Sequence, residues 1–279
     1  MSMPAKAKQF ILAASDPYAA EAAWYARAVA LGASPPAATR AAVLAFFTSF
    51  FAAGFALADF DYIYLMIGEA SGDTSASKYN QKRVNLVNPG TFDATVVNPN
   101  ASGHAALGTL GDLSMYWDSG YNSGSAPVSR TGNASSGIVI GAHGTGSADC
   151  YAGAIAAPSH IIQGRYAAGQ SYYYYGGSAA TNLGAPAAAP NMFWGNIITS
   201  VKVYNNTTEI FDSATGTEAP SAGSIYLFGF NNSGTPSQRC NVTLSLAWHG
   251  RSLSAGERTS WYTMIQTLMA AFGDRKSVV

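Results

Sequence analysis

The sequence contains few charged residues. They make up 11% of its 279 residues and cancel to a formal net charge of zero, whereas about a quarter of a usual globular chain is charged. The densest basic segments are the short stretches 6–8 and 81–83. Nucleic-acid binding needs a clustered basic surface, so we expect no nucleic-acid partner.

Cysteine is scarce as well. The two cysteines, Cys150 and Cys240, are too few for a structural zinc site, which takes four close ligands. We therefore expect no metal site and no cofactor. Cys240 falls on the apolar face of a predicted strand, which favours a buried thiol. A disulfide to Cys150 requires the two residues to lie close in space, and the sequence leaves that pairing open.

Long hydrophobic runs are almost absent. Residues 10–14 are too short for a signal-peptide core and are followed at once by Asp16-Pro17. Residues 41–58 carry no charge and reach the length threshold for a membrane span. Helix-capping residues nevertheless divide residues 17–54 into a helical hairpin, with one helix from Pro17 to Gly32 and another from Ser34 to Gly54. We therefore predict buried helices and no membrane span.

The last fifth of the chain carries the clearest local signals. In residues 240–248, apolar Cys, Val, Leu, Leu and Trp alternate with Asn, Thr and Ser, which predicts a strand with one face on a core. Ser254 and Glu257 then form a Ser-x-x-Glu capping box. Apolar residues follow at helical spacing up to Phe272, and Gly273 supplies a stop signal. A closing helix is predicted over residues 254–272.

Between the hairpin and this helix the pattern is that of a β-protein. Residues 60–67 predict a first long strand, and short apolar runs separated by turn clusters follow up to about residue 250. Residues 201–211 predict a hairpin with Asn205-Asn206 as its two-residue turn. The expected fold is mainly β, an antiparallel sandwich with an N-terminal helical hairpin and a C-terminal helix.

These segments resemble known families. Residues 201–211, 224–234 and 246–257 are similar to the end of a concanavalin A-like or laminin-G-like jelly roll, in which the final strand leads into a Leu-Ser/Thr-x-x-Glu turn and a short helix. Residues 26–67 are similar to the start of structural proteins of tailed bacteriophages and prophages. The resemblance implies a virion protein with a helical anchor over residues 1–58 and a jelly-roll sandwich over residues 59–279.

Catalytic motifs are missing from the sequence. It contains no Gly-x-Ser-x-Gly elbow and no His-Glu-x-x-His. The spacing of Glu209 and Asp212 puts their carboxylates on opposite faces of a strand. His143 and His249 adjoin glycines at predicted strand ends, which favours turn or edge positions. We therefore expect a protein that is not an enzyme.

Two aromatic segments are candidates for sugar binding, because aromatic faces stack on pyranose rings and polar side chains bond sugar hydroxyls. The alternative for both is packing, in the core for Trp117 and across strands or between subunits for the tyrosine run. The candidate glycan-binding residues are Tyr116, Trp117, Asp118, Tyr121, Asn122, Tyr173 and Tyr175.

Three functions from different classes are consistent with these features. The first is a non-enzymatic phage virion protein, of tail-fibre or tail-associated type, that binds host surface glycan through its jelly-roll loops. The second is a purely architectural capsid decoration or head-fibre protein. The third is a glycan-cleaving enzyme on a jelly-roll fold. The first is favoured. It predicts location in the virion after assembly in the bacterial host cytoplasm. The expected partners are other virion proteins, copies of the same chain in a symmetric assembly, and host surface polysaccharide.

Overall fold

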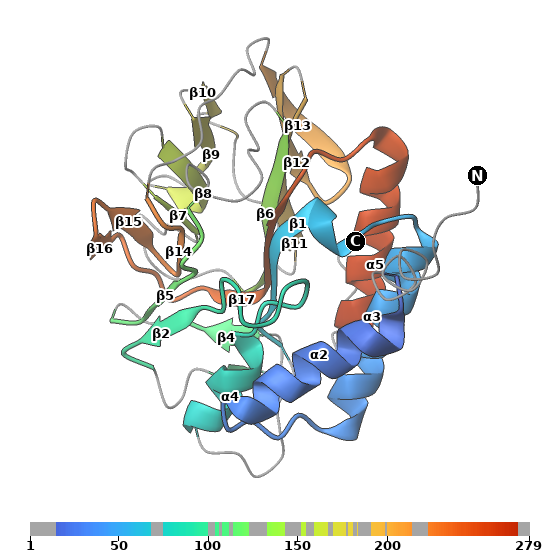
Figure 1. Ribbon diagram of the computed structural model, residues 1–279. Coiled ribbons are helices and arrows are strands. Elements are labelled where there is room, and N and C mark those ends of the chain that lie inside the picture. The colour runs from blue at the N-terminus through green and yellow to red at the C-terminus, as the bar shows by residue number, and fades with distance from the viewer. Residues whose placement is uncertain are drawn as a thin grey trace, which may run out of the picture.

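Two mostly antiparallel sheets face each other in the computed structural model of the chain, and helices cover the outer face of one sheet (Figure 1). The mainly β sandwich with helices near both ends confirms the coarse fold predicted from sequence. The structure describes residues 15–67, 75–99, 104–105, 108–111, 114–122, 133–142, 152–154, 159–166, 170–176, 178–180, 183, 191–198, 200–213 and 223–272.

The first sheet has eight strands in the order β13-β12-β11-β6-β17-β4-β3, with β1 also paired to β17. Its long central strands pair antiparallel over most of their length. The strands are β1 Phe60–Leu65, β3 His104–Ala105, β4 Gly108–Leu110, β6 Ala134–Ala142, β11 Asn191–Ile197, β12 Val201–Asn205, β13 Thr208–Ser213 and β17 Thr243–Gly250.

The second sheet has nine strands, and β10-β9-β8-β7-β14-β5-β2 form its main path. A small hairpin of β15 and β16 joins it through a parallel bridge to β7. The strands are β2 Thr95–Val97, β5 Tyr116–Asp118, β7 Ala152–Ala154, β8 Ser159–Tyr166, β9 Gln170–Gly176, β10 Ser178–Ala180, β14 Tyr226–Leu227, β15 Phe230–Asn232 and β16 Thr235–Ser237.

The predicted helical hairpin is formed by α2 (Pro17–Ala30) and α3 (Ala37–Ala52). Asp16 caps α2 by accepting a hydrogen bond from the Tyr18 amide at 2.9 Å, with Pro17 in the first turn. Gly32 and Gly54 follow the two helices with φ of 87° and 85°, a left-handed conformation that glycine adopts without steric cost. No helix in the described part of the chain has the length and apolar character needed to span a membrane.

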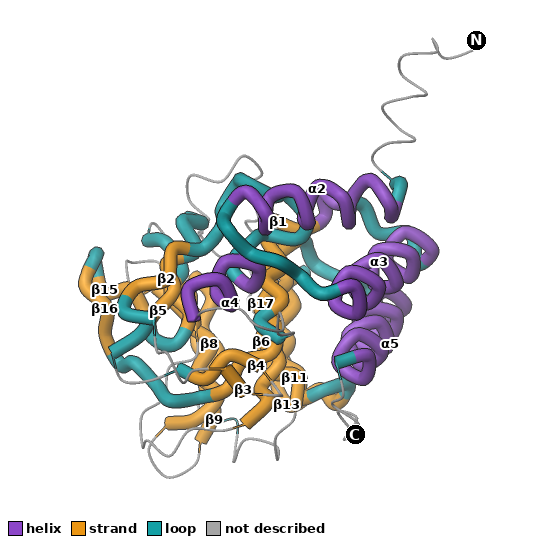
Figure 2. Tube along the Cα trace, turned by 90° about the horizontal axis from the view of Figure 1, so that it is seen from below, coloured by secondary structure: helices purple, strands orange, loops and turns teal. Residues whose placement is uncertain are grey.

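The central strands of the first sheet, β1, β6, β11 and β17, are buried on both faces. One face packs against α2, α3 and the closing helix α5 (Ala255–Ala271), and the other packs against the second sheet (Figure 2). On β1, Ile63 and Leu65 belong to the helix side, whereas Tyr62 and Tyr64 belong to the core between the sheets. β11 and β17 are buried at every residue, as expected of strands covered on both faces.

The alternation in the last strand was predicted to put Leu244, Leu246 and Trp248 on one face, and this is wrong. The pairing of β17 with β6 shifts register between Leu244 and Leu246. A bulge of this kind adds one residue and reverses the side-chain direction beyond it. Leu244 therefore packs between the sheets, whereas Leu246 and Trp248 pack under the helices. Thr243 and Ser245, expected on a solvent face, are buried as well.

Trp248 lies at the centre of the helix-side core. It is fully buried, with its ring centroid 5.6 Å from that of Trp261 on α5 and 6.3 Å from that of Trp194 on β11. Gly137 on β6 allows this approach, because a Cβ at that position would collide with Trp194 and with the Trp248 ring.

The closing helix begins as predicted. Ser254 accepts a hydrogen bond from the Glu257 amide, and the Glu257 carboxylate accepts one from the Ser254 amide. Arg251 lies beside this cap and bonds Glu257 at 2.6 Å and Asp59 at 2.8 Å. The α5 cap is thereby tied to η1 (Leu57–Asp59), which leads into β1.

Two local predictions differ from the structure. The two-residue turn of the β12–β13 hairpin is Asn206-Thr207, one residue later than predicted, and Asn206 has the left-handed φ of 54°. Helix α4 (Ser75–Lys82) begins within a segment read as a turn cluster. This helix has eight residues and is largely polar, so it carries little of the apolar periodicity that identifies helices in sequence.

We expect Trp248→Ala to lower the free energy of unfolding by about 3–5 kcal/mol, because large-to-small changes in a packed core lose transfer free energy and leave a cavity. Urea unfolding followed by circular dichroism measures this. Tyr18→Ala is the control, since Tyr18 is 70% exposed. A loss for Trp248→Ala as small as that of the control would contradict the central position of this ring.

Glu257→Gln tests the Arg251 contact through its pH dependence. Hydrogen bonding to Arg251 lowers the pKa of Glu257 from 4.5 to about 2. A carboxyl with a depressed folded-state pKa stabilises the protein above its unfolded pKa, and this stability is lost as the pH falls toward 2. Gln at this position keeps the capping box. We therefore expect the variant to be less stable than the parent at pH 7, with the difference shrinking between pH 4.5 and 2.

Urea midpoints at a series of pH values measure this difference. The comparison variant Ser254→Ala removes the cap without removing the charge, so its deficit of about 1 kcal/mol should change little with pH. A constant deficit for Glu257→Gln would mean that the ion pair adds nothing.

Candidate functional site

The first predicted sugar-binding segment is largely structural. Trp117 on β5 is fully buried and packs edge-on against Tyr79 and Phe228, at centroid distances of 6.0 and 5.9 Å. It therefore offers no face to a ligand, and the alternative of core packing is the one that fits. Tyr116 and Asp118 are half-buried on the opposite face of β5, where Tyr116 stacks on Tyr226 at 4.7 Å.

The turn after β5 separates the remaining residues of this segment. The Asp118 carboxylate accepts a hydrogen bond from the Gly120 amide at 2.9 Å, which shapes the turn. Tyr121 is fully buried, and Asn122 is half-buried. The prediction that Tyr121 lies in an exposed aromatic site is thus wrong, because its ring enters the core beside β1.

The second predicted segment lies elsewhere in the second sheet. The backbones of Tyr173 and Tyr175 are in β9, paired with β8 and β10. Three strands, β8, β7 and β14, separate β9 from β5 in the sheet order. The two segments therefore do not form one site. Cys150 lies outside the described residues, and Cys240 is buried between the sheets.

A polar cluster that the sequence did not indicate is centred on Asp61. Its Oδ2 atom lies 2.8 Å from His249 Nδ1 and accepts a hydrogen bond from the Tyr121 hydroxyl at 3.2 Å. An ionised carboxylate only accepts hydrogen bonds, so Nδ1 carries the proton toward Asp61. The His249 ring is buried, with the rings of Tyr121 and Tyr62 at 4.8 and 6.0 Å.

Strand pairing brings these residues together. His249 on β17 lies opposite Tyr62 on β1, and the register shifts between Phe60 and Tyr62. Asp61 therefore lies at a bulge, a feature that re-aims side chains and is frequent beside functional sites. The side chain of Asp61 is 6% exposed. The interpretation of His249 as a turn or edge residue is wrong, because β17 is paired on both sides.

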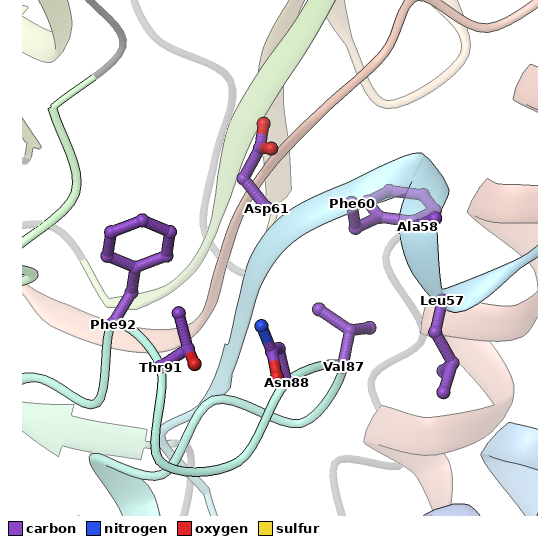
Figure 3. Close-up of a pocket in the computed structure, with 8 residues that line it drawn as sticks. All are labelled: Leu57, Ala58, Phe60, Asp61, Val87, Asn88, Thr91 and Phe92. Atoms are coloured by element: carbon purple, nitrogen blue, oxygen red, sulfur yellow. The ribbon is translucent and has the colours of Figure 1, made fainter. Parts of the chain in front are cut away.

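Asp61 opens onto a pocket of about 320 Å³. Figure 3 shows that the pocket lies between β1 and the loop that carries Val87, Asn88, Thr91 and Phe92. Val87 is buried, whereas Asn88 and Thr91 are exposed at the rim. The pocket, called the Asp61 pocket below, is lined by Leu57, Ala58, Phe60, Asp61, Val87, Asn88, Thr91 and Phe92.

Side-chain hydrogen bonds hold the pocket loop in place. Asn85 donates to the carbonyls of Asp61 at 2.9 Å and Thr91 at 3.0 Å, and accepts from the Ile63 amide at 3.1 Å. Asp93 accepts from the amides of Asn85 and Gly90. The second Asp93 oxygen contacts Arg27 of α2 at 2.6 Å.

Phe92 completes one wall of the pocket. It has a φ of 57°, which is uncommon for a bulky residue and is held by its surroundings. Its carbonyl accepts a hydrogen bond from the Tyr64 hydroxyl, and its ring contacts Tyr121 edge-on at 5.3 Å. The Asp61 pocket thus has fixed walls that combine an aromatic ring with a carboxylate, an amide and a hydroxyl.

Among the described residues, no three His, Cys, Asp or Glu side chains come together as metal ligands. The residues that line the Asp61 pocket offer hydrogen bonding, contact with a ring, and proton exchange at one carboxylate.

The sequence matches no family model and no curated protein. Solved structures do match. A Trypanosoma rangeli sialidase mutant with trans-sialidase activity matches with a TM-score of 0.51 and 14% identity, over 82% of this chain and 39% of the sialidase. Domain 4 of a GH43 arabinanase from Geobacillus stearothermophilus, in complex with arabinotriose, matches with a TM-score of 0.43 and 15% identity, over 72% of this chain and 97% of that domain. A mutant GH54 α-L-arabinofuranosidase matches with a TM-score of 0.39 and 11% identity, over 58% of this chain and 40% of that chain.

These comparisons correct the expected function. The matching structures named above are carbohydrate-active enzymes or a domain of one, and none is a phage protein. The sialidase match, at a TM-score of 0.51, contradicts the prediction of a non-enzymatic phage virion protein and the prediction that the chain is not an enzyme. The predicted virion location and partners are tested by no observation and stay predictions. At 14% identity and over 39% of the sialidase, this match shows a likeness of fold and assigns no activity to this chain.

We expect Asp61→Asn to destabilise the protein by about 1–3 kcal/mol, because the buried His249 and Tyr121 donors lose a charged acceptor. Thermal and urea unfolding measure the change. Thr91→Ala, at the exposed rim of the same pocket, is the control and should stay within about 0.5 kcal/mol of the parent. Equal stabilities for both variants would contradict the role of Asp61 in organising the cluster.

Proposed function

We propose that the protein is a carbohydrate-active β-sandwich protein that holds a sugar in the Asp61 pocket. The observation that carries this proposal is the composition of the pocket wall. The Phe92 ring lies beside Asp61, Asn88 and Thr91, whose oxygen and nitrogen atoms suit sugar hydroxyls. The pocket volume of about 320 Å³ lies at the lower end of the usual range for small-molecule sites, about 300–1,000 Å³, and suits one or two sugar rings.

The fixed pocket loop supports this proposal. Binding costs free energy for every side chain and loop that becomes ordered, so a preformed site binds more tightly than a flexible one. Asn85 and Asp93 already hold the loop through side-chain to backbone hydrogen bonds.

We also propose that the sandwich is of the concanavalin A-like jelly-roll type. The support is the pair of facing sheets and the last strand, β17, which leads through Leu253 into the Ser254–Glu257 cap of α5. The likeness to a sialidase at a TM-score of 0.51 agrees with a sandwich of this general kind.

A second candidate function is cleavage of the bound glycan. The arrangement that favours it is Asp61 at the pocket wall, with His249 and Tyr121 fixing one of its oxygens. In hydrolysis by this route, water adds to the anomeric carbon as the glycosidic C–O bond breaks. Asp61 accepts a proton from the water, and the leaving oxygen takes a proton from solvent.

Binding is tested on a glycan microarray, followed by calorimetry with the strongest hit. We expect Phe92→Ala to weaken the binding of that hit about tenfold, since aromatic contact contributes about 0.5–1.5 kcal/mol beyond area burial. Tyr18→Ala, which removes an exposed aromatic ring outside the pocket, is the control and should bind as the parent does. A blank array, or equal binding by Phe92→Ala, would refute a sugar site here.

Cleavage is tested by incubating the strongest hit, and 4-nitrophenyl α-L-arabinofuranoside as a chromogenic probe, with the parent and with Asp61→Asn. Release of reducing ends or 4-nitrophenol by the parent and its loss in a folded Asp61→Asn variant supports the second candidate. Binding without any release leaves the protein as a glycan binder.

A further inference from the structure

A second pocket, of about 230 Å³, lies between the tip of the β12–β13 hairpin and the first turns of α5. It shares no lining residue with the Asp61 pocket. Its volume is below the range of about 300–1,000 Å³ that is usual for drug-sized ligands, so it fits a ligand of one ring. The pocket, called the Arg258 pocket below, is lined by Trp194, Tyr204, Asn206, Thr207, Ala255, Arg258 and Thr259.

The walls of the Arg258 pocket are rigid. Trp194 and Tyr204 are buried and stacked, with centroids 4.6 Å apart and planes at 23°. The indole of Trp194 donates a hydrogen bond to the Asn206 carbonyl at 3.0 Å. Asn206 is fixed further, because its side-chain oxygen accepts from the Met192 amide at 2.8 Å.

Arg258 brings a positive charge to this pocket. Its guanidinium carbon lies 5.2 Å from the Tyr204 ring centroid, within the distance of a cation–π contact. The one hydrogen bond that its guanidinium makes within the described part of the chain is a long one, from Nη1 to the Leu253 carbonyl at 3.5 Å. A guanidinium has five donors in a planar fork, so most of the donors of Arg258 remain for a ligand.

The neighbouring cations form ion pairs, and Arg258 forms none with the described residues. Arg251 contacts Asp59 and Glu257, and Lys202 contacts Glu209 and Asp212. Within the part of the chain that the structure describes, no carboxylate forms an ion pair with Arg258. The guanidinium of Arg258 therefore lines the pocket without an ion-pair partner among the described residues, whereas Arg251 and Lys202 have such partners.

We propose that the Arg258 pocket binds the carboxylate of a small ring-shaped ligand, of the class of uronic acids. Arg forms bidentate, charge-assisted hydrogen bonds with carboxylates, and the planar fork suits this geometry better than an ammonium does. Thr207 and Thr259 line the same pocket. The Thr207 hydroxyl suits a ring hydroxyl as donor or acceptor, and the Thr259 hydroxyl, which donates to the Ala255 carbonyl at 3.4 Å, suits one as acceptor. The proposal stands independently of the Asp61 pocket, because the two sites share no residue.

The test is isothermal titration of the full chain with sodium D-glucuronate, with D-glucose as the neutral sugar of the same ring. We expect saturable binding of glucuronate and at least tenfold weaker binding of glucose. Arg258→Gln should weaken glucuronate binding at least tenfold. Arg258→Lys, which keeps the charge and loses the fork, should fall between Arg258→Gln and the parent.

The matched control is Arg239→Gln. Arg239 is half-buried, as Arg258 is, and donates to the Ser114 carbonyl at 2.9 Å outside this pocket. Its loss should leave glucuronate binding unchanged. Phe92→Ala should also leave it unchanged, which separates this site from the Asp61 pocket. Melting curves verify that each variant is folded.

The proposal is overturned if the parent shows no saturable binding at about 10 mM glucuronate, a concentration that detects even a millimolar Kd. Equal binding of glucose and glucuronate, or equal losses in Arg258→Gln and Arg239→Gln, would overturn it as well.

Discussion

The burial of the central strands of the first sheet on both faces is the constraint on which the other features depend. Helices α2, α3 and α5 cover one face and the second sheet covers the other, so every side chain of the central strands has to pack. The volume of each side chain then limits which residues fit, as at Gly137, where a Cβ would collide with Trp194 and Trp248. Interiors are close-packed, and such a sheet tolerates few changes of volume. The polar groups that do enter it, such as His249, require partners of their own.

Both candidate pockets lie where this doubly covered sheet meets a neighbouring element. The Asp61 pocket forms where β1 meets the loop of residues 83–94, and the Arg258 pocket forms where the β12–β13 hairpin meets α5. At such junctions the strands provide fixed backbones, and the adjoining loop or helix provides polar side chains. Charge is used sparingly in this chain, so a carboxylate or guanidinium at a pocket wall is a specific signal rather than a general property of the surface.

The sequence predicts the features that local signals determine. The closing helix follows from Ser254 and Glu257, and the helical hairpin from Asp16-Pro17 and two glycines. It does not reveal the bulge in β17, because register is decided by pairing with β6, about a hundred residues earlier in the chain. The Asp61–His249 contact joins residues 188 positions apart. The sequence makes Trp117 and Tyr121 candidates for a surface site, but both are buried. Aromatic residues beside a glycine turn are compatible with either position, and only the sheet topology decides between them.

Helix α2 and the Asp61 pocket are joined by a continuous chain of polar contacts. Arg27 bonds Asp93, Asp93 holds the backbone amides of Gly90 and Asn85, and Asn85 holds the carbonyl of Asp61. The N-terminal hairpin therefore covers the sheet and also holds the pocket loop in position. A force or a partner that displaced α2 would pull directly on the pocket loop, so attachment at the hairpin and occupancy of the pocket would be coupled through the carboxylate of Asp93.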